Sequence, residues 1–416
     1  MDRVLRVSTA SEGSRHNGGR RTGWHFLQIP GPTNTPARIL AAMSRPTIDH
    51  RGPEFLSLSR GILADIREIF QTAHPVIVFP SSGTGAWEAA LVNIASPGDR
   101  VLMAETGHFS KLWSEVAMRL GLRPELVPGD WRSGADPEAI AAWLSEDRQH
   151  EIKAVCVVHN ETSTGAFSRI GDIRRAIDAT GHPALFIVDT ISSLGSMEYR
   201  PDAWGVDITV AGSQKGLMLP PGLGFNAVGP KALAMARKAT LPKSYFDWQA
   251  MLAAPETGQF PYTPATNLMF GLREAIDMLL EEGLDAVFAR HERHATAVRN
   301  AVDAWGLELL CASIEERSNA LTAVMMPATK SADALRAHIL RRFDVSLGSG
   351  LSRLSDKVFR IGHLGDLNDI MLIGTVSAVE MGLKETGIAV RGSGVQAAMK
   401  SLSRETGTAG EPLAVS

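Results

Sequence analysis

The chain has 416 residues, which predicts two or three domains at roughly 100 to 200 residues per domain. Its 42 Lys and Arg residues nearly balance 45 Asp and Glu residues, and the net charge of -3 provides no basic excess for nucleic acid or anionic lipid. The longest apolar runs are far shorter than the roughly 20 residues that cross a bilayer. We therefore expect a soluble protein that is not a general polyanion binder.

The sequence contains two cysteines, Cys156 and Cys311, which form neither a disulfide framework nor a Cys-x-x-Cys metal site. We expect a cytoplasmic, reducing environment and no metal. Residues 1–23 are rich in Arg, Ser and Gly, and their acidic residues and Gly-Gly pair disfavour a mitochondrial presequence. We predict that residues 1–23 and 401–416 are mobile tails.

Short runs rich in Val and Ile alternate with longer helix-like segments, a pattern that predicts an α/β fold with a mostly parallel sheet covered on both faces. The predicted strands are residues 76–79, 101–104, 154–158, 185–188 and 208–211. The predicted helices between them are residues 86–94, 110–120 and 170–179. Open parallel sheets bind ligands beyond the carboxyl ends of their strands, so the residues after these strands are the candidates for chemistry.

The texture changes near Asn267, where long helical stretches begin. We therefore predict a large domain over residues 24–266 and a smaller α/β domain over 267–400. The smaller domain is expected to contain helices 268–282, 284–305, 332–343 and 368–383, strands 307–311, 321–326 and 358–361, and a glycine loop at 347–351. Residues 290–294, which hold two Arg and two His, read as the solvated face of a helix.

A Gly-rich turn, Ser81-Ser-Gly-Thr-Gly85, lies between a predicted strand and a predicted helix. The backbone N–H groups and the positive end of the helix dipole could hold a phosphate there. A tight turn without any ligand is an equally good interpretation of these residues taken alone.

Two charged residues follow predicted strands of the same sheet. Asp189 comes directly after the run 185–188, where its carboxylate could instead cap a helix. Lys215 follows 208–211, and a lone lysine is usually a solvated surface charge. Because both residues stand at the carboxyl ends of strands, we expect them to lie close together.

A pyridoxal phosphate enzyme needs a lysine that forms a Schiff base with the cofactor aldehyde, a carboxylate beside the pyridine nitrogen, and a helix N-terminus for the phosphate. All three are present, in workable order. With these motifs the sequence resembles the class V aminotransferases of fold type I, and more narrowly the serine–glyoxylate and alanine–glyoxylate group. The resemblance runs from about Ile29 to about Gly382.

The resemblance implies pyridoxal 5'-phosphate as cofactor and assigns residues to it. Lys215, in Ser-Gln-Lys, matches the Schiff-base lysine, and Asp189 matches the carboxylate at the pyridine nitrogen. The phosphate contacts that the resemblance implies are Ser82, Gly83, Thr84 and Gln214.

Further roles also follow from the resemblance. Phe109 occupies the position of an aromatic that stacks on the pyridine ring, where many relatives have Trp. Ser163 or Thr164 matches the donor to the ring's phenolic oxygen, and Thr263 matches a residue that a partner subunit contributes to the phosphate. Arg360 matches the arginine that pairs with the substrate α-carboxylate through two parallel hydrogen bonds. A homodimer with shared active sites is implied.

Three other readings have less support. A nicotinamide-dependent oxidoreductase would use Gly83, Gly85 and the acid Glu105, but Glu88 stands where the third glycine of that motif belongs. A cysteine desulfurase would need a thiol on a mobile loop, and both thiols lie in predicted strands. A non-catalytic scaffold could lose the lysine or the carboxylate, and this chain keeps both.

Four residues near the expected site rank lower as candidates. His50 and Arg51 precede Gly52-Pro53 in a predicted loop and could contact a substrate side chain, although a turn histidine and a solvated arginine are equally good interpretations. His159 and Asn160 follow a predicted strand and could support the site from behind.

The sequence therefore predicts a homodimeric aminotransferase that moves the amino group of a small L-amino acid to glyoxylate, giving glycine and a 2-keto acid. Serine is the favoured donor, and aspartate and alanine remain alternatives because all three share the carboxylate that Arg360 would bind. Two half-reactions in one site predict ping-pong kinetics.

Overall fold

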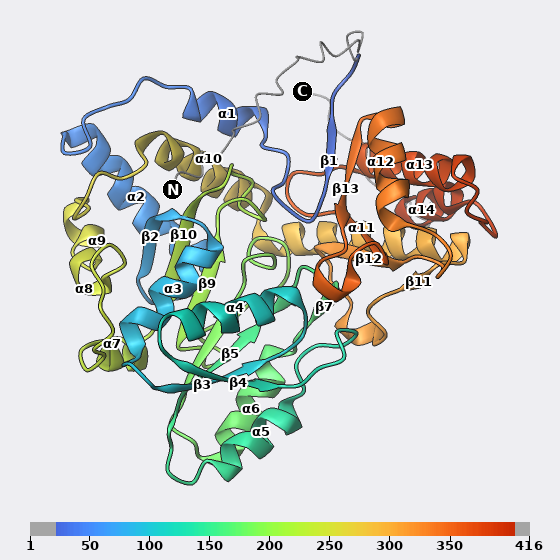
Figure 1. Ribbon diagram of the computed structural model, residues 1–416. Helices are drawn as coiled ribbons and strands as arrows, with labels where there is room; N and C mark the ends of the chain where they lie inside the picture. The colour runs from blue at the N-terminus through green and yellow to red at the C-terminus, as the bar shows by residue number, and fades with distance from the viewer. Residues whose placement is uncertain (1–21, 404–416) are drawn as a thin grey trace, which may run out of the picture.

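A computed structural model describes residues 22–403 of the chain. Apart from residues 22–23 and 401–403, the two predicted tails lie outside the described residues. The described chain forms a seven-stranded sheet and a five-stranded sheet, each covered by helices (Figure 1). The predicted α/β class is confirmed.

The seven-stranded sheet is mostly parallel. Its order is β2 (Val76–Ser81), β10 (Gly222–Val228), β9 (Ile208–Gly212), β8 (Leu185–Asp189), β5 (Ile152–Val158), β3 (Arg100–Ala104) and β4 (Arg123–Val127). β10 runs antiparallel to β2 and β9, and the other neighbours pair in parallel. The carboxyl ends of β2, β9, β8 and β5 therefore lie along one edge of the sheet.

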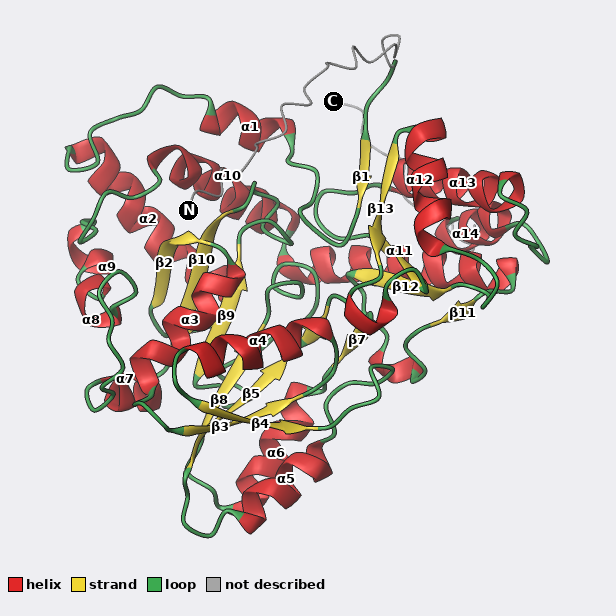
Figure 2. Cartoon of the chain, viewed as in Figure 1, coloured by secondary structure: helices red, strands yellow, loops and turns green. Residues whose placement is uncertain are grey.

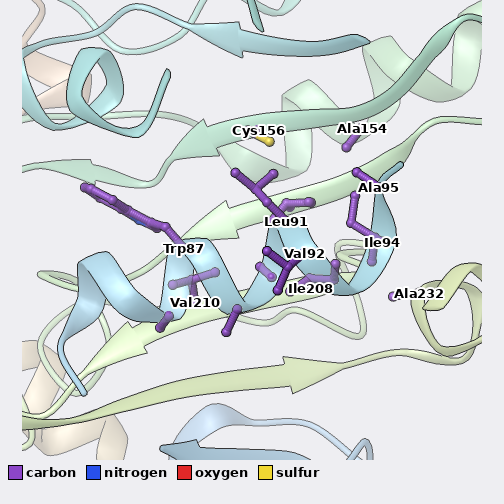
Figure 3. Packing of buried hydrophobic residues seen from close by; sticks show 14 of the residues in the cluster. Trp87, Leu91, Val92, Ile94, Ala95, Ala154, Cys156, Ile208, Val210 and Ala232 are labelled. Atoms are coloured by element: carbon purple, nitrogen blue, oxygen red, sulfur yellow. The ribbon is translucent and has the colours of Figure 1, made fainter. Parts of the chain in front are cut away.

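Helices bury both faces of this sheet, so its central strands are apolar at almost every position. One face is covered by α3 (Gly83–Ile94), α4 (His108–Arg119) and α7 (Pro230–Ala236), and the other by α2 (Pro53–Phe70), α5 (Pro137–Glu146), α6 (Ile170–Thr180) and α10 (Thr266–Glu282). Successive strand residues divide between the faces: Cys156 packs with the α3 side, and Val155 with the α5 and α6 side. Figure 3 shows Trp87 and Leu91 of α3 in the same cluster as Cys156 and Ile208.

The five-stranded sheet belongs to the smaller part of the molecule, which Figure 2 shows beside the larger sheet. Its order is β1 (Phe26–Gln28), β13 (Val345–Ser349), β14 (Val358–Gly362), β12 (Leu321–Met325) and β11 (Glu308–Leu309). Its helices are α11 (Leu284–Trp305), α12 (Ala332–Phe343), α13 (Asp369–Glu385) and α14 (Gly394–Leu402). β1 thus joins the smaller sheet, although its residues fall in the predicted range 24–266. The domain boundaries stay a prediction.

Short elements complete the described chain. They are α1 (Ala37–Met43), the ribbon β6 (Asn160–Glu161) with β7 (Ala166–Phe167), α8 (Trp248–Met251), α9 (Ala254–Thr257), and the 3₁₀ turns η1 (Ile314–Glu316) and η2 (Ser352–Leu354). Over residues 22–403, no helix combines the length and the apolar content needed to cross a membrane.

Three details of the smaller part differ from the sequence prediction. The expected glycine loop at 347–351 begins inside β13, and the expected strand at 307–311 is reduced to two residues. The predicted solvated face at 290–294 is wrong for its histidines, because His291 and His294 are fully buried. His291 Nε2 accepts from the Gly365 backbone N–H at 3.1 Å, and His294 Nε2 hydrogen-bonds Asp369 at the start of α13 at 2.9 Å.

Candidate active site

A cavity of about 230 Å³ lies at the carboxyl edge of the seven-stranded sheet. Its lining includes seven of the residues that the sequence assigned to the site, namely Ser82, Gly83, Thr84, Phe109, Asp189, Gln214 and Lys215. Ser163, Thr164, Thr263 and Arg360 are not part of its lining. The structure thus gathers the residues expected around the phosphate, the ring nitrogen and the aldehyde.

Lys215 lies just beyond β9 and is 6% exposed. Its Nζ donates to the carbonyl oxygen of Pro30. Burial, together with the nearby positive charge of Arg360, lowers the pKa of the Lys215 ammonium to about 7. Gly31, beside Pro30, has φ +96°, and a Cβ there would overlap the Lys215 side chain. This position therefore needs glycine.

Asp189 is the last residue of β8 and is 3% exposed. Its Oδ2 accepts from Trp87 Nε1 at 3.0 Å, and its Oδ1 accepts from the Ile191 backbone N–H at 2.6 Å. Burial raises the pKa of the Asp189 carboxyl to about 7, against the effect of these hydrogen bonds. The Ile191 bond spans two residues, so Asp189 also shapes the turn that follows the strand.

The Gly-rich turn opens α3 and faces the cavity. Ser82 is the N-cap residue, with φ -128° and ψ 176°, and its side chain does not cap the helix. The first backbone N–H groups of a helix have no partner within it, and the helix dipole favours an anion there. Gly83 is buried against Ile191, where a Cβ would overlap the Ile191 side chain. Oε1 of Gln214 is buried without a hydrogen-bond partner.

Glu161 is a buried carboxylate that no sequence motif singled out. It accepts from the backbone N–H groups of Phe109 at 3.3 Å and Ser110 at 3.1 Å, at the start of α4. It also accepts from the Ser163 hydroxyl at 2.6 Å, so the proton of this hydroxyl is already donated within the protein. Thr164 lines a separate, smaller cavity. The donor roles of Ser163 and Thr164 stay a prediction.

Asn160 and Thr162 line the cavity in the segment where Ser163 or Thr164 was expected. Asn160 Nδ2 and Thr162 Oγ1 both donate to Ser192 Oγ, at 2.9 Å and 2.8 Å. The Asn160 Oδ1 atom is buried without a partner, which leaves this acceptor available to a ligand that donates a hydrogen bond. Its neighbour His159 is buried, which lowers the pKa of this histidine to about 3.

Arg360 lies in β14 of the smaller sheet and is 7% exposed. Its Nη1 donates to the Thr162 carbonyl at 2.6 Å, and its Nε donates to the Ser349 carbonyl at 2.7 Å. Burial lowers the pKa of its guanidinium to about 10. No carboxylate within residues 22–403 forms an ion pair with it, so an anionic ligand could take that place.

The structure gives no support to the competing functions. Glu105, the expected ribose-binding acid, accepts from Trp131 Nε1 at 2.8 Å. Cys156 and Cys311 are buried, and burial raises the pKa of both thiols, which is unfavourable for a nucleophile. Thr263 is exposed on the described chain and is not part of the cavity lining.

The residues of the cavity fit pyridoxal phosphate. A buried carboxylate suits the pyridine nitrogen, and a buried lysine with a pKa near 7 suits a carbonyl group. Two residues that line the cavity, Gln214 and Asn160, carry buried amide oxygens with no hydrogen-bond partner, and such acceptors could receive a hydrogen bond from a bound ligand. The N-terminus of α3 provides for the phosphate.

Fold and site together define a pyridoxal phosphate-dependent aminotransferase of fold type I. The aminotransferase class-V family matches residues 25–357, and the chain belongs to this family. A serine–glyoxylate aminotransferase of Methylorubrum extorquens is 47% identical over 92% of this chain and 97% of its own length. An L-aspartate–glyoxylate aminotransferase of Paracoccus denitrificans is 43% identical over 93% of this chain and 98% of its own.

Solved structures agree with this assignment. The ureidoglycine–glyoxylate aminotransferase of Bacillus subtilis superposes with a TM-score of 0.85 at 27% identity, over 92% of this chain and 99% of that one. The pyridoxamine–pyruvate aminotransferase of Mesorhizobium loti gives 0.84 at 30% identity, over 91% and 96%. The family, the fold type and the cofactor predicted from the sequence are confirmed.

Proposed function

We propose that this aminotransferase moves the amino group of a small L-amino acid, with serine favoured, to glyoxylate, giving glycine and a 2-keto acid. The observation that carries the proposal is the identity of 44 to 47% with three serine–glyoxylate aminotransferases, over 90 to 92% of the chain. Aspartate and alanine remain the alternative donors on the same scaffold.

When bound, pyridoxal phosphate supplies an electron sink that permits the Cα–H bond of the amino acid to break. Lys215 is the residue that would hold the cofactor covalently and, once the substrate amine has displaced it, would accept the proton that leaves the substrate Cα. An amine with a pKa near 10 would be protonated at neutral pH, whereas burial brings the pKa of Lys215 to about 7. The lysine can therefore accept a proton under physiological conditions.

The Asp189 carboxylate would favour a proton on the pyridine nitrogen of the bound cofactor, because a nearby negative charge stabilises the pyridinium, and the protonated ring is electron-poor. Arg360 binds the carboxylate beside the reacting carbon. Because the amino donor and glyoxylate both carry that carboxylate and occupy the site in turn, one guanidinium serves both half-reactions. These roles of Lys215, Asp189 and Arg360 remain proposals.

Steady-state rates with serine, alanine and aspartate as donors, and glyoxylate as acceptor, test the proposal. We expect kcat/KM to be highest for serine. A higher kcat/KM for aspartate would identify aspartate as the preferred donor instead of serine. If none of the three amino acids transferred its amino group to glyoxylate, the proposed reaction would be rejected.

We also propose a cytoplasmic homodimer with shared active sites. Thr263 is exposed and does not line the cavity of its own chain, which is compatible with a contact across a two-fold axis. The two free thiols, Cys156 and Cys311, are compatible with a reducing compartment.

A further inference from the structure

Trp87 lies in the first turns of α3 and reaches the floor of the cavity. Its side chain is 1% exposed and is part of both the cavity lining and the hydrophobic cluster beneath it (Figure 3). Its Nε1 donates to Asp189 Oδ2 at 3.0 Å. This tryptophan therefore connects the packed core to the carboxylate that faces the pyridine nitrogen.

Asp189 receives two hydrogen bonds within the described chain, one on each oxygen. The Ile191 N–H serves Oδ1 and belongs to the turn, so the Trp87 bond alone fixes Oδ2 from a second element. Without it, the carboxylate could rotate, and a buried charge would lose a donor that offsets its desolvation. A charged, oriented carboxylate is what the ring nitrogen requires.

The two charged groups near Asp189 have opposite effects on the pKa of its carboxyl. Lys215 favours the ionised carboxylate and Glu161 disfavours it. His159, whose backbone N–H donates to the Asp189 carbonyl, stays neutral because burial lowers its pKa to about 3, and burial raises the pKa of Tyr199. The Trp87 N–H is thus a fixed, uncharged donor that does not change with pH.

We propose that Trp87 is a positioning residue, whose indole N–H orients the Asp189 carboxylate and keeps it ionised against the pyridine nitrogen of the cofactor. The inference depends on the cofactor and not on which amino acid is the donor. It gives this helix a role in the chemistry as well as in the core.

Trp113 of α4 provides a matched control. Its ring stacks on that of Trp87, with centroids 5.6 Å apart and planes 12° apart, and it is equally buried. Its own Nε1 is buried with no hydrogen-bond partner. Replacing Trp113 by Phe therefore removes the same atoms from the same stack without removing a bond to Asp189.

The test compares Trp87→Phe with Trp113→Phe in holoenzyme loaded with pyridoxal phosphate labelled with ¹⁵N in the ring. We expect the ring ¹⁵N shift of Trp87→Phe to move toward the unprotonated position, and its cofactor Kd to rise. The Trp113→Phe variant should keep the wild-type shift. With the preferred donor, kcat of Trp87→Phe should fall about 10- to 100-fold, the usual effect of losing a hydrogen bond to a charged group, while KM changes little.

A further variant covers the case in which Trp87→Phe does not fold. Replacing Trp87 by 3-benzothienylalanine exchanges the N–H for sulfur and keeps the bicyclic shape, so the core is preserved and the same ¹⁵N change is expected. In an Asp189→Asn background, either change at Trp87 should have no further effect on the ¹⁵N shift. An unaltered shift in the benzothienyl variant, or equal shifts in the two phenylalanine variants, would overturn the proposal. The shift is read without any amino donor, so an error in donor specificity leaves this test intact.

Discussion

The Arg360 Nη1 atom and the Thr162 carbonyl oxygen, 2.6 Å apart, join the two sheets of the molecule. Arg360 lies in β14 of the smaller sheet, and Thr162 follows β6 at the carboxyl edge of the larger one. Together with the bond from Arg360 Nε to the Ser349 carbonyl, it fixes the orientation of the guanidinium plane. If Arg360 binds the substrate carboxylate as proposed, that carboxylate meets a preoriented cation, which lowers the entropy lost on binding.

Replacing Arg360 tests whether one arginine serves both substrates. Arg360→Ala should weaken the amino donor and glyoxylate alike by ~2 to 5 kcal/mol, or roughly 30-fold to several thousand-fold. Arg360→Lys should recover part of this loss, because an ammonium keeps the charge without the planar fork. The two half-reactions, followed separately by cofactor absorbance, give the measurement. Impairment of one half-reaction alone would assign Arg360 to a single substrate.

Asp189→Asn preserves the size of the side chain and removes its negative charge. The ring nitrogen is then less readily protonated, so the ring stabilises less of the negative charge that develops when the substrate Cα loses its proton. We expect the activation free energy for kcat to rise by several kcal/mol, about the cost of deleting other preorganised groups. Stopped-flow measurement of the first half-reaction checks this. Nearly full activity of the Asn variant would leave Asp189 with a structural role alone, through its hydrogen bonds with Ile191 and Trp87.

The buried amine of Lys215 should destabilise the cofactor-free protein in a pH-dependent way. Between pH about 7 and about 10.4 the unfolded chain holds a proton that the folded chain has released, so stability rises with pH through this window. Lys215→Met removes the amine and should increase the free energy of unfolding by up to about 5 kcal/mol at pH 7, and by much less near pH 10.

Thermal unfolding of the cofactor-free protein at pH 7 and pH 9.5 measures this gain. Lys357→Met makes the same chemical change at an exposed position, and it should alter the melting temperature little at either pH. A Lys215→Met gain that is identical at both pH values would contradict the lowered pKa of the lysine.

Thr263 tests the proposed dimer. If its hydroxyl reaches the phosphate bound by a neighbouring subunit, Thr263→Ala should raise the cofactor Kd about 5- to 10-fold, the usual cost of one hydrogen bond, without changing the cavity of its own chain. Equilibrium dialysis measures the Kd, and analytical ultracentrifugation at assay concentration measures the assembly. A fully active monomer would disprove the shared site.

Periodicity and composition predicted the elements that are long or buried on both sides. The helices at 284–305 and 332–343 coincide with α11 and α12, and the central strands fall within one or two residues of their predicted ends. Their apolar runs are long because both faces are covered, which makes the signal strong.

The missed elements lack such a signal for physical reasons. β4 contains Pro124 and charged residues because it is an edge strand, where fewer backbone N–H groups are needed for pairing. β10 contains two glycines, and a Cβ on Gly224 would overlap the Ser82 carbonyl oxygen.

The chemistry was easier to predict at strand ends than in loops or helices. Asp189 and Lys215 stand out because a charge directly after an apolar run is unusual. Trp87 resembles any core residue of an apolar helix, and only the three-dimensional position of its N–H distinguishes it. Glu161 likewise gives no local sign that it binds the start of a helix about fifty positions earlier.

The parallel pairing of β1 with β13, Phe26 opposite Val345, brings together segments more than three hundred residues apart. During synthesis, β1 leaves the ribosome early. Its partner β13 is synthesised late, before only one other strand of the same sheet, β14. The smaller sheet therefore closes late, after the long intervening chain has folded, and this nonlocal closure is the kind of step that slows folding. Until β1 pairs, the backbone groups on one side of β13 have no partner strand. Deletion of residues 26–28 would make β13 the edge strand permanently, and we expect the truncated protein to aggregate more readily.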